Sequence, residues 1–231
     1  MGGDGNAMTP NSSREGFMFR HRSEAADRLA ERLKAYAGQH PVILAIPRGA
    51  VPMALILAKK LGGDLDVVLV RKLRAPHQPE LAIGSVNERG ETYLNEDAKL
   101  YGGTKDYIAA EVRIQLATIH HRRAQYTQVS SSIDFAGRIV IVVDDGLATG
   151  ATMLAALQSV RTGKPAKLIC AVPVSPPDTL AKVKRLADEV VCLQTPPYFQ
   201  AVGQFYRHFP QVDDQEVIDI LRSNALRVGD E

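Results

Sequence analysis

The strongest constraint on the fold is a series of short apolar runs that alternate with segments of helical periodicity. The run at 139–143, Ile-Val-Ile-Val-Val, is continuous and β-branched, as expected of a strand buried on both faces. Similar runs occupy 42–46, 67–70, 168–174 and 190–193, and helical spacing occupies 23–37, 53–61, 104–126, 150–160 and 178–187. Strands that alternate with helices imply right-handed crossovers. We therefore predict an α/β fold, with helices on both faces of a parallel sheet.

Length, charge and composition favour a single domain over residues 17–231. The 231 residues are 45% apolar and 23% charged, and the net charge of +2 argues against nucleic acid as a partner. Residues 1–16 are rich in Gly, Asn and Ser, so we expect a disordered leader and no signal peptide. No run is long enough to span a membrane, and Cys170 and Cys192 lie in apolar runs that suit free thiols. These features predict a cytoplasmic protein.

Two segments interrupt the alternation. Residues 71–95 contain two prolines, two glycines and mixed charge, which predicts a long flexible loop or a loose hairpin, with His77 as an ordinary loop residue. The C-terminal segment 195–231 begins with an aromatic-rich irregular stretch at 195–210, and a short helix follows with Asp213 as its cap. Ser23 is the expected cap of the first helix. Excursions of this kind commonly carry function.

The residues after the run at 139–143 carry the clearest chemistry. Asp144 and Asp145 are followed by a turn with Gly146, Gly150 and two threonines that opens a helix. A helix N-terminus with glycines and hydroxyls binds phosphate, and adjacent carboxylates suit a ligand that also carries hydroxyls or a metal. Crowding of the two carboxylates predicts that Asp145→Asn keeps or raises the stability of the unliganded protein. A Walker loop and a dinucleotide fingerprint are both missing from the sequence.

The sequence IVIVVDDGLATGAT resembles the 5-phosphoribosyl-1-pyrophosphate (PRPP) motif of type I phosphoribosyltransferases, and the order of elements from about 19 to 221 resembles that family. The chain looks most like the bacterial "predicted phosphoribosyltransferases". The resemblance implies the phosphoribosyltransferase fold, with a flexible loop at 71–95 and a small hood and helix at 195–231. It implies that Asp144 and Asp145 bind the ribose hydroxyls. The 5-phosphate would be wrapped by Gly146, Leu147, Ala148, Thr149, Gly150, Ala151 and Thr152.

Two further strand ends carry candidate pyrophosphate ligands. Pro47-Arg48-Gly49-Ala50 offers backbone N–H groups of Gly49 and Ala50 and the guanidinium of Arg48. By itself such a turn is common, and the resemblance identifies it as the pyrophosphate loop of the family. Arg71 and Lys72 directly follow the run at 67–70. At the corresponding place, members of the family have a basic residue that contacts pyrophosphate. We accordingly predict Asp144, Asp145, Arg48 and Lys72 as the catalytic residues.

The resemblance implies an enzyme that transfers the 5-phosphoribosyl group from PRPP to a nitrogenous base and releases pyrophosphate, as in nucleotide metabolism. Mg²⁺ would be bound mainly through PRPP, with Asp144 and Asp145 as further candidate ligands. Tyr198 and Phe199 are candidates for stacking on the base. We expect a homodimer. The alternative is a PRPP-sensing regulator with the same fold and no turnover.

Other polar residues give weaker signals. His120 and His121 are adjacent on a helix and point apart, which argues against metal ligation. With Arg122 and Arg123 they are expected to form a solvated helical face. An unrelated α/β hydrolase or kinase is a third option, and the sequence lacks both a G-x-S-x-G elbow and a Walker lysine.

Overall fold

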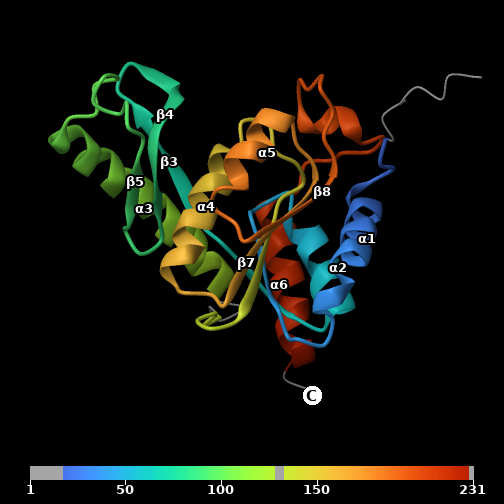
Figure 1. Cartoon of the computed structure of the whole chain (residues 1–231). Coiled ribbons are helices and arrows are strands. Elements are labelled where there is room, and N and C mark those ends of the chain that lie inside the picture. Colours follow the sequence, from blue (N-terminus) through green and yellow to red (C-terminus); the bar gives the residue numbers. More distant parts are fainter. Residues whose placement is uncertain (1–17, 128–132, 229–231) are drawn as a thin grey trace, which may run out of the picture.

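The computed structural model describes residues 18–127 and 133–228, and its centre is a five-stranded parallel sheet (Figure 1). The strand order is β2-β1-β6-β7-β8. The bounds are β1 Val42–Ala45, β2 Asp64–Val67, β6 Ile139–Val143, β7 Lys167–Val174 and β8 Glu189–Gln194. In the register Val42 lies opposite both Asp64 and Val140, so β1 and β6 are neighbours in the middle of the sheet. The leader expected at 1–16 lies outside the described residues.

Helices cover both faces of the main sheet, which confirms the predicted fold class (Figure 1). Helices α1 (Arg22–Arg32), α2 (Val51–Leu61) and α6 (Asp214–Val228) pack with Ile43 and Ile141 on one face. Helices α4 (Ala151–Thr162) and α5 (Pro177–Val183) pack with Leu44 and Val142 on the other. Because successive residues of a strand point to opposite faces, both faces of these runs are apolar. Each such side chain contributes about 1.5–3 kcal/mol by burial.

A second sheet of three antiparallel strands lies beside the main one, in the order β3-β4-β5. Its strands are β3 Val70–Ala75, β4 Gln78–Asn87 and β5 Thr92–Leu94, and the helix α3 (Lys105–Thr127) packs against β3 and β4 (Figure 1). The segment predicted as a flexible loop or hairpin therefore consists largely of paired strands. Its core residues Leu73 and Ile83 are fully buried. The closure of this segment over a ligand stays a prediction.

The predicted strand at 67–70 is wrong, because the chain passes there from one sheet to the other. β2 ends at Val67 in the main sheet, and β3 begins at Val70 in the small sheet. Val68 and Leu69 between them are buried, at 7% and 5% exposure. An apolar run shows burial but not which sheet the backbone joins, so the sequence pattern merged two strands.

The helix ends agree with the sequence in part. Asp213 caps α6 as predicted, with its Oδ1 accepting from the backbone N–H of Glu216 at 2.8 Å. The cap of α1 is His21 instead of Ser23, because the Nδ1 atom of His21 accepts from the N–H of Glu24. Helix α5 ends at Val183, earlier than the predicted 187. Within the described residues both cysteines are free, and no helix is long and apolar enough to cross a membrane.

Candidate functional site

Two of the predicted turns meet at the carboxyl edge of the main sheet. β1 and β6 are hydrogen-bonded neighbours, and the turns that follow them lead into α2 and α4. A Cβ atom built on Gly49 would lie 2.1 Å from Oδ2 of Asp145. The carboxylate of Asp145 therefore rests against the backbone of the Pro47-Arg48-Gly49 turn. Ligands of open α/β proteins bind outside the carboxyl ends of the strands, so this edge is the candidate site.

The turn between β6 and α4, which the sequence predicts as a phosphate loop, exposes backbone at the start of a helix. Gly150 is the N-cap of α4 at a φ of 74°, a left-handed conformation that glycine adopts without strain. A Cβ there would also lie 2.5 Å from Cγ2 of Thr179. Ala148 and Thr149 are exposed, so the backbone before the helix is open to an anion. Leu147 points inward instead: it is 2% exposed and its N–H donates to the carbonyl of Val174.

The two carboxylates of the acidic pair have different surroundings. Burial, and then the neighbouring charge of Asp145, raise the pKa of Asp144 well above its usual value. Oδ1 of Asp144 accepts from the backbone N–H of Asp145 at 2.9 Å. Burial also raises the pKa of Asp145, but the guanidinium of Arg22 opposes that shift. The pair thus combines one carboxyl that resists ionisation with one that is held by a cation.

Arg22 is a residue of the site that sequence reasoning missed. Its Nε and Nη2 atoms both lie 2.9 Å from Oδ2 of Asp145, and the two side chains are only 10% and 15% exposed. Removing one member of a nearly buried ion pair is destabilising, so Asp145→Asn is now expected to lower the stability of the unliganded protein. The opposite expectation from the sequence counted only repulsion from Asp144. No local pattern reveals Arg22, because it precedes Asp145 by 123 residues.

Arg48 lies in the turn after β1 and reaches toward the C-terminal helix. Its Nη1 atom is 3.4 Å from Oδ2 of Asp214, and the side chain is 31% exposed. The hydroxyl of Tyr126 donates to Oδ1 of the same carboxylate at 2.9 Å. The peptide bond between Pro47 and Arg48 is cis. Within the part of the chain that the structure describes, the side chain of Arg48 therefore has one weak partner and keeps N–H donors for an anion.

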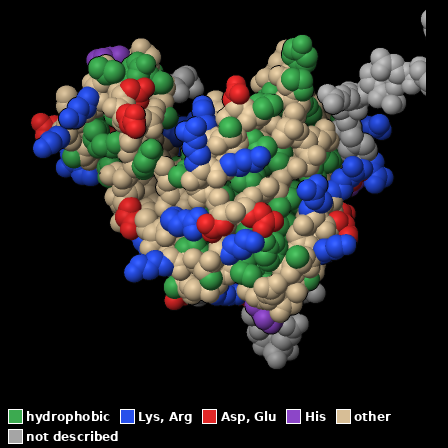
Figure 2. Space-filling model, viewed as in Figure 1, with side chains coloured by type: hydrophobic (Ala, Val, Ile, Leu, Met, Phe, Trp, Pro, Cys, Tyr) green, Lys and Arg blue, Asp and Glu red, His purple; other side chains and the backbone are tan. Residues whose placement is uncertain are grey.

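A cavity of about 330 Å³ beside this turn is lined by four cationic residues. Arg71, Lys72 and Arg74 come from β3 and Arg122 from α3, and the lining also includes Pro47, Val70, Pro79, Ala82 and Thr152. Burial, and then the charges of Arg122 and Arg74, lower the pKa of Arg71. Figure 2 shows Lys and Arg side chains beside the hollow between the small-sheet lobe and the main body. So many like charges around one cavity favour an anionic ligand.

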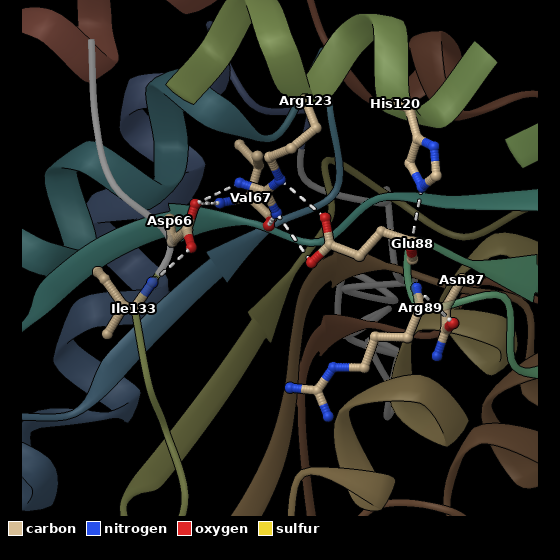
Figure 3. Close-up of polar contacts among 8 residues, drawn as sticks. All are labelled: Asp66, Val67, Asn87, Glu88, Arg89, His120, Arg123 and Ile133. Atoms are coloured by element: carbon tan, nitrogen blue, oxygen red, sulfur yellow. Dashed lines mark hydrogen bonds and ion pairs between the residues drawn. The ribbon is translucent and has the colours of Figure 1, made fainter. Parts of the chain in front are cut away.

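The prediction of a solvated face on α3 holds for His120 and His121, which are exposed, and fails for Arg123. Arg123 is 14% exposed and forms ion pairs with Asp66 at 3.0 Å and Glu88 at 2.7 Å (Figure 3). Its Nη2 atom also donates to the carbonyl of Val67. On the same helix, Nε2 of His120 lies 3.2 Å from the carbonyl oxygen of Glu88. Arg123 alone of the four residues 120–123 thus links Asp66 of β2 to Glu88, which follows β4.

The hood, defined as residues 195–210, lies over the acidic turn. A Cβ on Gly146 would meet Val202 at 2.6 Å, and the hydroxyl of Tyr206 donates to the carbonyl of Asp145 at 2.7 Å. Of the two aromatic candidates, Phe199 packs against Phe205 with ring centroids 5.0 Å apart. Tyr198 is 87% exposed and lines a cavity of about 850 Å³ with Met18, Gln194, Thr195, Pro196, Pro197, Gln204 and Phe205.

The site offers few ligands for a metal ion. No group of three or more His, Cys, Asp or Glu side chains that could hold a metal occurs within residues 18–127 and 133–228. Asp144 and Asp145 provide carboxylate oxygens of the type that Mg²⁺ prefers, and Arg22 already engages one of those oxygens. Asp144 and Asp145 therefore fit a metal ion that is coordinated mainly by a bound small molecule, with the protein providing only their carboxylate oxygens.

The chain belongs to the phosphoribosyl transferase domain family, because the model of that family matches residues 20–209. Two curated relatives from Mycobacterium tuberculosis, strains CDC 1551 and H37Rv, are each 44% identical over 206 residues and carry the description "Putative phosphoribosyl transferase". That match covers 88% of this chain and 46% of each relative, so the chain spans about half their length. A crystal structure of a Thermus thermophilus protein is 42% identical with a TM-score of 0.82, covering 90% of this chain and 99% of that one.

Proposed function

We propose that the protein transfers the 5-phosphoribosyl group of PRPP to a nitrogenous base or related acceptor and releases pyrophosphate. The observation that carries the proposal is the meeting of the acidic turn at Asp144 and Asp145 with the turn at Arg48 and Gly49. One turn suits ribose hydroxyls and a 5-phosphate, and the other suits a diphosphate. PRPP carries these groups on one sugar.

In the proposed reaction, the bond between C1 of the ribose and the pyrophosphate oxygen breaks, and a bond from C1 to the acceptor nitrogen forms. The electron pair of the broken bond leaves with pyrophosphate, and the acceptor nitrogen releases its proton to water. Positive charge grows on the sugar while negative charge grows on the leaving group, so preorganised electrostatics matter most. Asp144 and Asp145 hold the sugar, and the loop from Gly146 to Thr152 anchors its phosphate.

The cations around the 330 Å³ cavity stabilise the leaving group. Arg71 and Lys72 provide donors for diphosphate oxygens, and Arg74 and Arg122 add positive charge to the same cavity. Arg48 provides further donors from the turn after β1. Mg²⁺ bound with the diphosphate would neutralise part of its charge. Asp144 and Asp145 would provide the carboxylate oxygens by which the protein holds that ion. Closure of the segment 71–95 would exclude water, which otherwise competes with the acceptor.

The acceptor is proposed to be a nucleobase stacked on Tyr198 at the hood. Support comes from the exposure of this ring and the largely uncharged cavity beside it. Phe199 is a weaker candidate than the sequence suggested, because its ring packs against Phe205.

The test is pyrophosphate release from PRPP and Mg²⁺ in the presence of individual nucleobases, with PRPP binding measured in parallel by thermal shift. PRPP at a hundred times its dissociation constant should stabilise the fold by about 2.7 kcal/mol. Pyrophosphate release with one or a few bases supports the enzyme. Binding without release for any base favours the PRPP-sensing regulator, and a melting temperature that does not respond to PRPP contradicts both functions.

A further inference from the structure

The guanidinium of Arg22 lies where three parts of the candidate site meet. Arg22 is the first residue of α1 and precedes Asp145 by 123 residues. Two of its nitrogens donate to one oxygen of Asp145. Its Nη2 atom would lie 3.3 Å from a Cβ on Gly49, so it also borders the pyrophosphate-loop candidate.

The remaining donors and the face of the same guanidinium engage the hood. Nη1 donates to the carbonyl oxygen of Pro210 at 2.7 Å, and the guanidinium carbon lies 3.8 Å from the centroid of the Phe209 ring. The Phe209 ring in turn stacks on Tyr206, whose hydroxyl donates to the carbonyl of Asp145. The planar fork of arginine makes these contacts together, which a lysine cannot do.

These contacts fix both the acidic turn and the hood. Nε, Nη1 and Nη2 each donate to the protein, and an aromatic ring covers one face of the group. Little of Arg22 is left to touch a ligand directly. Oδ1 of Asp145 takes no part in the two contacts with Arg22, and its direction is set once Oδ2 is held.

We propose that Arg22 is a positioning residue, which aims the carboxylate of Asp145 at the ribose and ties the hood to the acidic turn. The inference rests on the proposed function, because it assumes that Asp145 meets ribose hydroxyls. A purely structural ion pair would stabilise the fold without favouring one ligand over another. Positioning predicts a selective effect: ligands with a ribose depend on Arg22, and pyrophosphate alone does not.

The experiment measures the dissociation constants of ribose 5-phosphate and of inorganic pyrophosphate by calorimetry, for the wild-type chain and for Arg22→Met. Loss of a charge-assisted contact should weaken ribose 5-phosphate by about tenfold or more. Pyrophosphate affinity should change less than about twofold, because the guanidinium nitrogens of Arg22 are engaged by Asp145 and Pro210 and provide no donor to the diphosphate. Arg28→Met is the matched control on the same helix, because Arg28 pairs with Glu24 at the surface. It should change neither affinity.

Two further variants show whether Arg22 acts through Asp145. On an Asp145→Asn background, Arg22→Met should cause no additional loss of ribose 5-phosphate affinity, because the shared contact is already gone. Arg22→Lys should recover part of the loss through its charge. If Arg22→Met fails to fold, Arg22→Lys alone decides, since lysine cannot hold Asp145 and Pro210 together; an unchanged affinity for ribose 5-phosphate in that variant would then overturn the proposal.

The outcomes separate this inference from the function on which it rests. A wild-type chain that binds no ribose 5-phosphate would contradict the proposed function itself. Wild-type binding that Arg22→Met leaves intact, or that falls by the same factor as pyrophosphate binding, would overturn the positioning role and leave the proposed function standing.

Discussion

Replacing Arg123 by leucine should destabilise the protein strongly, because Arg123 is the cation of a buried network (Figure 3). The side chain of Asp66 is 6% exposed, and its remaining partners among the described residues would be the N–H groups of Val67, at 2.7 Å, and Ile133, at 3.1 Å. The side chain of Glu88 is 34% exposed and can recover contacts with water. The cost is therefore mainly the uncompensated charge of Asp66.

Breaking a buried pair from one side costs about 3–5 kcal/mol. For a chain of this length, each kcal/mol corresponds to about 2–4 °C in melting temperature, so Arg123→Leu should lower it by roughly 6–20 °C. Urea denaturation followed by circular dichroism gives the free energy directly. Arg122→Leu is the matched control on the same helix. Because Arg122 lines a cavity among other cations, its removal should change stability by less than about 1 kcal/mol.

A second substitution checks the physical reason. Adding Asp66→Asn to Arg123→Leu removes the buried charge that the first change leaves unpaired, so the double variant should recover part of the lost stability. A loss below about 1 kcal/mol for Arg123→Leu would refute the reasoning. So would a double variant no more stable than the single one. Either result would mean that water reaches Asp66 in the folded protein.

Three further predictions concern the site. Burial and the charge of Asp145 raise the pKa of Asp144, so the folded state holds a proton that the unfolded chain releases, and stability should fall as pH rises from the ordinary aspartate range toward the raised pKa. Asp144→Asn should flatten that part of the denaturation-against-pH curve, and an unchanged slope would contradict the shift. Arg48→Ala should weaken pyrophosphate and PRPP about tenfold or more in calorimetry while sparing ribose 5-phosphate; equal losses would argue against its assignment to the diphosphate. Hydrogen exchange across 71–95 should slow when PRPP and Mg²⁺ are added, and equal protection with and without ligand would contradict closure.

The candidate site shows how far local patterns extend. The turn from Asp144 to Thr152 was recognisable because its chemistry is contiguous: a buried strand, two carboxylates, and glycines that open a helix. In the structure Gly150 has the left-handed conformation at the N-cap of α4, whereas Leu147 of the same turn is buried. The neighbouring turn at Arg48 gave a weaker sequence signal, because such a turn is common by itself. Its pairing with the acidic turn follows from the adjacency of β1 and β6, which only strand order decides.

The sequence by itself determined the strands, the helices and the two turns, because each is a pattern within about fifteen positions. Their alternation along the chain then implied the parallel sheet. Only the tertiary structure decided the partners of those turns. Arg22 reaches Asp145 across 123 residues, and Arg123 reaches Asp66 across 57. The tertiary structure also decided that Val67 and Val70, which lie in one apolar run, belong to strands of two different sheets. Periodicity reports whether a side chain is buried, but the identity of its neighbour depends on how distant segments pack.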